Sequence, residues 1–222
     1  ENTGVGYLAL YSTTTASDNT AVGRSALAAN VTGANNTAVG RDALLTNVTG
    51  SDNVAIGYEA LKVGTVGDNT AVGHTALTAN TTGNYNTAVG ASALAANTTN
   101  GNNTAVGYYA LKVSTAGNNT AVGTNAGLVT VAGNYNTFMG ANTAIANTAG
   151  FSNSAFGAGA LAANTDADNN TAIGYLAMAA NTAGENVAVG MNAMLTNTTG
   201  NNNTAVGKDA LKTNATTNNN TA

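Results

Sequence analysis

The sequence contains no cysteine, no proline and no tryptophan, and only 7% of its 222 residues are charged. Without cysteine there is no disulfide framework and no cysteine-ligated metal site. The charged fraction is far below the roughly 25% of ordinary globular proteins. A formal net charge of −4 argues against nucleic acid as a partner, because nucleic-acid-binding surfaces are basic. No apolar run approaches the roughly 20 residues of a membrane-spanning helix, so we expect no membrane insertion.

The main feature of the sequence is one short motif that recurs along its whole length. The pentapeptide Asn-Thr-Ala-Val-Gly and its close variants place a glycine at thirteen anchor positions, 17 residues apart nine times and 16 apart three times. A fixed period of this length is typical of solenoids. The chain starts and stops inside repeats. We therefore expect residues 1–222 to form a single repeat-array domain, a piece of a longer fibre protein.

Each repeat favours short strands over helix. The apolar residues come in pairs, Ala-Val and Ala-Leu, separated by Gly and Asn, without the sustained 3.6-residue spacing of an amphipathic helix. Gly, Asn, Thr and Val at this density disfavour helix, and the Thr-Thr-Gly segments suit turns. The sequence therefore predicts an all-β fold, a parallel β-solenoid (β-roll) of about 13 coils with 16–17-residue repeats, stacked at about 4.8 Å per coil.

An asparagine stands four residues before every anchor glycine. Side-chain amides on stacked identical coils can hydrogen-bond to those above and below. We predict a structural ladder made of Asn19, Asn36, Asn53, Asn69, Asn86, Asn103, Asn119, Asn136, Asn153, Asn170, Asn186 and Asn203.

A second set of asparagines begins Asn-x-Thr sequons. A repeat rich in Asn and Thr produces such sequons by composition alone, and glycosylation is the alternative reading. The sequons begin at Asn30, Asn47, Asn80, Asn97 and Asn197.

Ala and Val occupy neighbouring positions in each strand, and neither position holds a charged residue in any repeat. A coil this short encloses one thin core, which we expect Val and Leu to fill, so the Ala column needs a second surface such as a neighbouring subunit. Gly127 and Ala144 stand at positions that hold Leu in most other repeats. We expect Phe138 and Phe156 to fill the core there in compensation. Phe151 stands in a loop and is expected outside.

Large polar and aromatic side chains gather just after the anchor glycine. All six basic residues stand one or five positions after it, and the single histidine, His74, is expected to be exposed there. One interpretation is that these side chains only keep the surface solvated. The functional interpretation is a stripe that contacts glycans, because tyrosine offers an apolar face and a hydroxyl together. The candidate recognition residues are Tyr58, Tyr108, Tyr109, Tyr175, Arg24 and Arg41.

The sequence shows no pattern that indicates catalysis. His74 has no recurring Ser or Asp near it for a triad, the ten acidic residues are scattered over different columns, and no glycine-rich stretch forms a phosphate-binding loop. We therefore predict no enzyme activity, no catalytic residue, no cofactor and no metal site.

The motifs resemble known repeats. NTAVGRSAL, NVAIGYEAL and NTAVGYYAL are similar to the head repeats of trimeric autotransporter adhesins, and NTTGNNNTAVGKDAL resembles repeats of phage tail-fibre and bacterial surface-fibre proteins. The resemblance covers the whole chain and implies a left-handed homotrimeric fibre. It also implies an extracellular location, on a cell surface or on a virion tail fibre.

These observations lead to an expected function as a structural fibre and adhesion module that gives a stiff repetitive shaft or head for surface attachment. Its partners would be further copies of itself and a cell-surface glycan or receptor. One alternative is a self-assembling extracellular filament subunit that polymerises end to end. A second is an ice-binding solenoid, which needs flat threonine rows; the threonine column is broken by Val54 and Val187.

Overall fold

A computed structural model describes residues 1–222 and confirms an all-β solenoid in which every coil contributes one strand of three residues. Each strand ends directly before an anchor glycine. The strands are β1 (Thr3–Val5), β2 (Thr20–Val22), β3 (Thr37–Val39), β4 (Val54–Ile56), β5 (Thr70–Val72), β6 (Thr87–Val89), β7 (Thr104–Val106), β8 (Thr120–Val122), β9 (Thr137–Met139), β10 (Ser154–Phe156), β11 (Thr171–Ile173), β12 (Val187–Val189) and β13 (Thr204–Val206).

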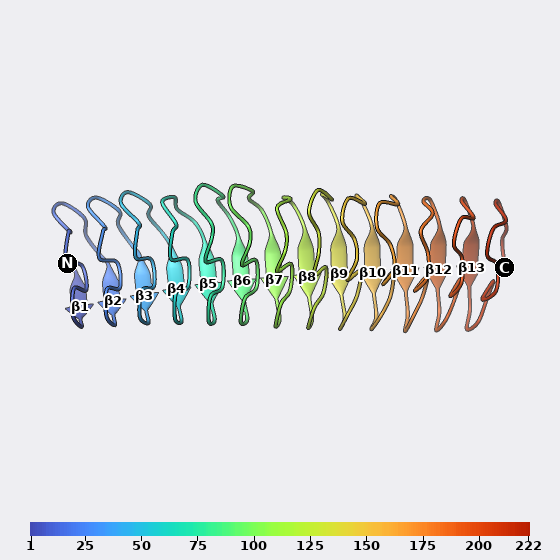
Figure 1. Cartoon of the computed structure of the whole chain (residues 1–222), viewed down its shortest axis with the longest axis horizontal. Helices are drawn as coiled ribbons and strands as arrows, with labels where there is room; N and C mark the ends of the chain where they lie inside the picture. Colours follow the sequence, from blue (N-terminus) through green and yellow to red (C-terminus); the bar gives the residue numbers. More distant parts are fainter. The chain divides into compact units, whose positions relative to one another are not determined.

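The chain divides into two compact units, Glu1–Thr115 and Ala116–Ala222, built from the same coil. In the first unit β1 to β7 pair in chain order, and in the second β8 to β13 do the same, always in parallel (Figure 1). The register pairs equivalent residues of successive repeats, such as Ala38 with Ala55 and Val39 with Ile56. Coils shortened to 16 residues keep this register, because Val54 still pairs with Thr70.

The inward face of each strand carries alanine, not valine, which corrects the expected core. The strand alanines are fully buried from Ala21 onward, with Phe138 in their place in β9, whereas the next residue is 37% exposed at Val22 and 38% at Ile56. A Cβ placed at Gly4, which takes the alanine position in β1, would lie 3.4 Å from Leu10 Cδ1. The coil is therefore so narrow that a methyl group on the sheet already contacts the leucine opposite it. A valine there would overpack the core.

The anchor glycines are required by both space and backbone conformation. Their φ angles lie between 131° and 141°, a region that L-residues rarely adopt. A Cβ at Gly57 would lie 2.5 Å from the carbonyl oxygen of Gly73 in the next coil. The corner of the coil therefore brings backbone against backbone, and only glycine fits.

The buried leucine column lies in the left-handed region of the backbone. Leu44 has φ of 49° and Leu61 has φ of 48°. A β-branched side chain is strongly disfavoured at such angles, whereas an unbranched or absent Cβ substituent is tolerated. This explains why the column accepts Leu, Met, Ala and Gly but never Val or Ile, although all are apolar.

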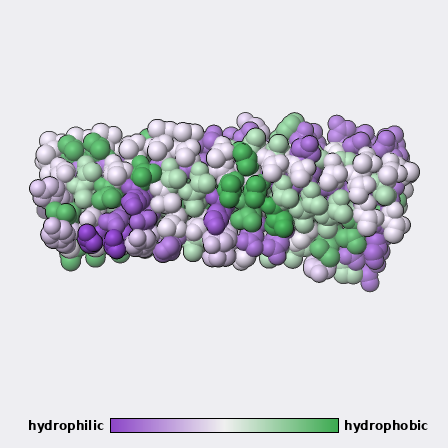
Figure 2. All heavy atoms as spheres, viewed as in Figure 1, coloured by the Kyte–Doolittle hydropathy of each residue, from purple (hydrophilic) through white to green (hydrophobic).

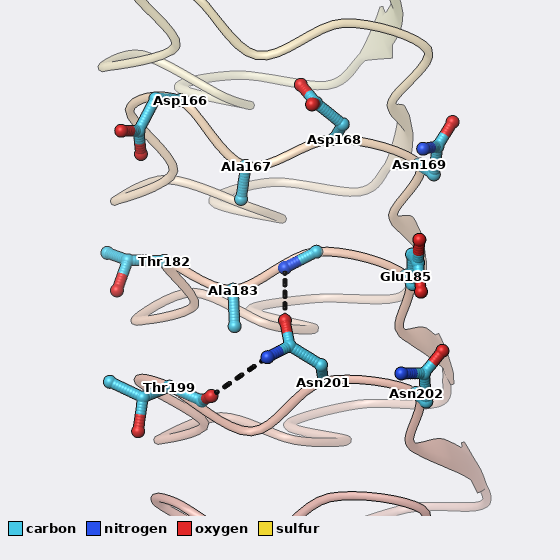
Figure 3. Close-up of a pocket in the computed structure, with 11 residues that line it drawn as sticks. Asp166, Ala167, Asp168, Asn169, Thr182, Ala183, Glu185, Thr199, Asn201 and Asn202 are labelled. Carbon is cyan, nitrogen blue, oxygen red and sulfur yellow. Dashed lines mark hydrogen bonds between the residues drawn. The ribbon is translucent and has the colours of Figure 1, made fainter.

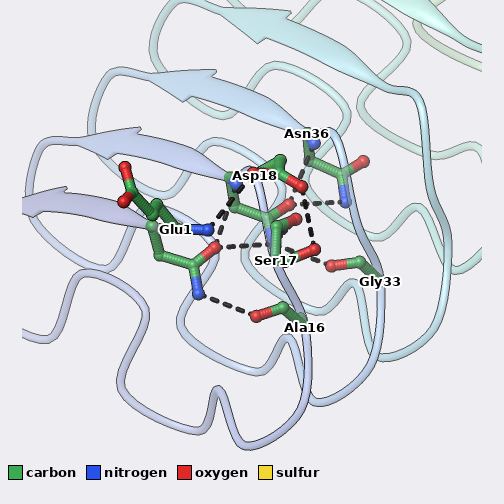
Figure 4. Close-up of polar contacts among 8 residues, drawn as sticks. Glu1, Ala16, Ser17, Asp18, Gly33 and Asn36 are labelled. Atoms are coloured by element: carbon green, nitrogen blue, oxygen red, sulfur yellow. Dashed lines mark hydrogen bonds and ion pairs between the residues drawn. The ribbon is translucent and has the colours of Figure 1, made fainter.

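The predicted asparagine ladder is confirmed, and it is built from stronger contacts than side chain to side chain alone. Oδ1 of Asn19 accepts hydrogen bonds from the Asn36 backbone N–H at 2.9 Å and from Asn36 Nδ2 at 3.1 Å (Figure 4). Nδ2 of Asn36 also donates across the coil to the Gly50 carbonyl at 2.9 Å. Asn36 therefore joins its own strand, the neighbouring coil and the opposite turn, and Asn53, Asn136 and Asn153 make the same bond across the coil. All twelve are at most 1% exposed.

The sequon asparagines form a second buried ladder, which the sequence interpretation missed. Nδ2 of Asn47 donates to Asn30 Oδ1 at 3.0 Å and to the Gly50 carbonyl at 2.9 Å, and the same pattern joins Asn97 to Asn80. All five predicted sequon side chains are 0% exposed. A glycan on these amides would have no room, so the compositional origin of the sequons is the correct one. The regular recurrence of these asparagines at one position of the repeat was the sequence signal for a second ladder.

The phenylalanine region confirms volume compensation for one ring and corrects it for another. Phe138 occupies the inward alanine position of β9 and is 0% exposed, in the part of the core where the leucine column holds Gly127 and Ala144. Phe156 takes the outward valine position of β10 and is only half-buried, so its expected place in the core is wrong. Phe151 is 47% exposed, as expected.

Candidate interaction surfaces

In each unit the first and third residues of the strands point away from the core and form what is called here the outer sheet face. Its third position holds Val, Ile, Met or Phe in all thirteen strands, and its first position holds Thr in ten of them. No charged residue interrupts either row. Strands stack at about 4.8 Å, so the face offers parallel rows of branched side chains at that spacing. Such a face is suited to packing against another apolar surface.

The residues after the anchor glycine form a second surface, called here the basic–aromatic column: Tyr7, Arg24, Arg41, Tyr58 and His74, from five consecutive coils. The Arg41 guanidinium carbon lies 5.5 Å from the centre of the Tyr58 ring. The Tyr58 and His74 rings stack with centroids 5.2 Å apart. The structure thus brings the predicted residues Arg24, Arg41 and Tyr58 together, and it places His74 on the surface as expected.

Two ion pairs flank this column. Arg41 Nε donates to Asp42 Oδ2 at 3.1 Å, and Lys62 Nζ lies 3.0 Å from Glu59 Oε1. The hydrogen bond from Lys62 lowers the pKa of Glu59, and the same bond raises the pKa of Lys62. Both groups are near the surface, so solvent screens the pair and it contributes little to stability.

Tyr108 and Tyr109 form a separate cluster two coils beyond His74. Their rings stack with centroids 3.8 Å apart, and Lys112 Nζ lies 3.8 Å from the centre of the Tyr109 ring. The hydrogen bond with Tyr108, together with the Lys112 charge, lowers the pKa of Tyr109. The small Ala91 stands between this cluster and the basic–aromatic column.

Tyr175 lies in the second unit, on the wall of an apolar notch of about 550 Å³. The coil before it contributes small lining residues, Ala158, Gly159 and Ala162. The Leu176 side chain lies against Gly159, because a Cβ on Gly159 would meet Leu176 Cδ2 at 2.6 Å. The predicted recognition residues therefore do not form one continuous stripe.

A larger hollow of about 640 Å³ lies among the loops of the second unit. Asp166, Asp168 and Glu185 line it, but their carboxylates point in different directions (Figure 3). Asp168 Oδ1 accepts the Phe151 backbone N–H at 2.9 Å. No group of three or more His, Cys, Asp or Glu side chains in the chain could hold a metal ion. Asp166 Oδ1 likewise accepts from the Thr165 hydroxyl at 3.0 Å, so these two carboxylates bond to the turns around them.

No protein-family model matches the chain, and no curated protein is similar to it in sequence. No helix of the chain is long and apolar enough to cross a membrane. The resemblance to adhesin heads and fibre repeats therefore stays a prediction that depends on the motifs alone.

Proposed function

We propose that the chain is a structural fibre and adhesion module of a cell-surface or virion appendage, and that its copies associate through the outer sheet face. The observation that carries the proposal is the row of half-buried to exposed Val, Ile, Met and Phe side chains along strands whose inward face is complete without them. In this role the protein supplies length and a repeated surface, and it catalyses no reaction.

Self-association is supported by the chemistry of the outer sheet face. Exposed apolar side chains are ordinary when scattered, but a contiguous row marks an interaction surface. β-Branched side chains in parallel rows can interdigitate with an equal face of another copy, as two sheets do in a sandwich about 10 Å apart. A homotrimer is our preferred assembly, since the adhesin-head resemblance implies one.

Extension by whole coils is supported by the internal contacts. Each coil gives the next the same strand register and the same asparagine bonds, as between Asn36 and Asn53. Repeat proteins of this kind gain stability through nearest-neighbour contacts, so the coil number can change without redesign of the core.

The experiment measures oligomeric state by native mass spectrometry and sedimentation. We expect a trimer that Ile56→Lys with Val72→Lys dissociates, because these paired residues would place two charges on the outer sheet face. The matched control is Ala91→Lys with Ala95→Lys, in columns that carry lysine in other coils, and it should remain trimeric. A wild-type mass of one chain at all concentrations would refute the self-association. A broad length distribution in micrographs would instead indicate the filament alternative.

The same face supports one second candidate. Its threonine row points outward beside the valine row, the arrangement that an ice-binding solenoid would need, although Val54, Ser154 and Val187 interrupt it. Shaping of ice crystals by the wild-type protein, lost in Ile56→Lys with Val72→Lys, would favour this function over self-association. Ice crystals of unaltered shape would exclude it.

A further inference from the structure

The basic–aromatic column is held rigidly by the backbone. The carbonyl of each member accepts a hydrogen bond from the second residue after the anchor glycine of the next coil: Tyr7 from Ser25 at 2.8 Å, Arg24 from Asp42 at 2.9 Å, Arg41 from Glu59 at 3.0 Å and Tyr58 from Thr75 at 2.9 Å. The side chains therefore project from fixed points about 4.8 Å apart. The backbone of this surface therefore loses little conformational entropy when a ligand arrives, and the ordering cost falls on the side chains.

Stacking within the column decides which atoms a ligand can reach. The Tyr58 ring stacks on His74 of the next coil and lies near the guanidinium of Arg41 from the coil before. Tyr58 is still 38% exposed, so part of its side chain is open to a ligand. The Thr75 hydroxyl lies 3.3 Å from His74 Nδ1, which leaves Nε2 as the outward nitrogen of the imidazole. Around Tyr58 the column thus presents guanidinium, phenol and imidazole groups, while the Tyr7 ring is 71% exposed.

The cations of this region lie further out than the carboxylates that flank them. The Arg41 side chain is 53% exposed and its partner Asp42 only 14%, while Lys62 is 33% exposed and Glu59 only 22%. Arg24 is exposed and forms no ion pair. A ligand that approaches this surface therefore meets positive charge first, in a chain whose net charge is −4. Figure 2 shows strongly hydrophilic atoms gathered over the first coils.

We propose that the basic–aromatic column binds an acidic polysaccharide, a chain of sugar rings that carry carboxylates, and this proposal rests on the adhesion function proposed above. Arg24 and Arg41 would each hold a carboxylate through paired N–H donors. Tyr58 and His74 would bind the hydroxyls of the following sugars. The spacing of the coils is close to the length of one pyranose ring, so successive groups meet successive sugars. Single-stranded nucleic acid fits less well, because its bases stack on free aromatic faces, and the Tyr58 and His74 rings of the column stack on each other instead.

The test measures binding of polygalacturonate by isothermal titration calorimetry at low salt, with neutral dextran and oligo-dT as comparison ligands. We expect binding of polygalacturonate alone, weakened at least about tenfold by Arg24→Ser with Arg41→Ser, since each substitution removes a charge-assisted hydrogen bond to a carboxylate. Arg24→Lys with Arg41→Lys should retain part of the affinity, because lysine keeps the charge but not the paired donors. The matched control is Lys208→Ser, which removes a cation from the same column position in the second unit and should bind as the wild type does.

The proposal would be overturned by no binding of polygalacturonate, by equal binding of dextran, or by unchanged affinity in the double serine variant. Tighter binding of oligo-dT than of polygalacturonate would assign the column to nucleic acid and also overturn it. The oligomeric state of each variant is measured in parallel. Failure of glycan binding with an intact trimer therefore refutes this inference without touching the proposed self-association.

Discussion

The asparagine ladder gives the sharpest test of how this solenoid is held together, and Asn36→Ala is the informative change. Oδ1 of Asn36 accepts from the Asn53 backbone N–H at 3.0 Å and from Asn53 Nδ2 at 3.1 Å. After truncation Asn53 Nδ2 keeps the Val66 carbonyl at 2.9 Å, and the Gly50 carbonyl keeps Asn47 Nδ2 at 2.9 Å. The Asn53 backbone N–H alone loses its acceptor inside the core.

The magnitude follows from this inventory. One buried donor left unpaired costs about 1–3 kcal/mol, and the bonds lost elsewhere add about 1 kcal/mol in net terms. We therefore expect Asn36→Ala to lower the free energy of unfolding by about 2–4 kcal/mol. The adjacent Asn35→Gly is the matched control, because Asn35 is exposed and its φ of 59° suits glycine. It should cost less than about 1 kcal/mol.

Urea unfolding followed by circular dichroism gives the two stabilities, and amide hydrogen exchange gives the location of the damage. The Asn53 amide should exchange much faster in Asn36→Ala, while amides several coils away keep their protection, since contacts in a solenoid are between neighbours. Equal unfolding midpoints for the two variants, or unchanged protection at Asn53, would refute the account of the ladder.

Two further predictions concern the core. Phe138→Ala should lose about 3–5 kcal/mol through the cavity left behind, and Phe156→Ala clearly less, because Phe156 lies on the outer sheet face; similar losses in urea unfolding would contradict this placement. Leu44→Ile should be less stable than Leu44→Met by about 1–2 kcal/mol, since φ of 49° penalises a β-branched side chain; equal melting temperatures would show that the left-handed backbone does not select the residue.

The functional surfaces could be predicted only in part. The sequence places Arg24, Arg41 and Tyr58 in one column, because the period alone aligns residues of successive coils. It also groups Tyr175 with them, although Tyr175 lies at a separate notch that is lined in part by small residues of the coil before it. The stacking of Tyr58 on His74, and the deeper position of Asp42 beneath Arg41, depend on side-chain packing that a column of letters does not contain.

The sequence by itself determined the architecture. A period of 16–17 residues, an unbroken asparagine column and a glycine at every corner can be satisfied together only by stacked coils, where identical residues meet identical neighbours. The tertiary structure decided which face of the strand is inside. The alternation of side chains along a strand puts Ala38 and Val39 on opposite faces, but it does not show which of the two faces the core. The narrow coil decides this orientation, because the methyl group of alanine already fills the space beside the leucine and the larger valine lies on the outer face.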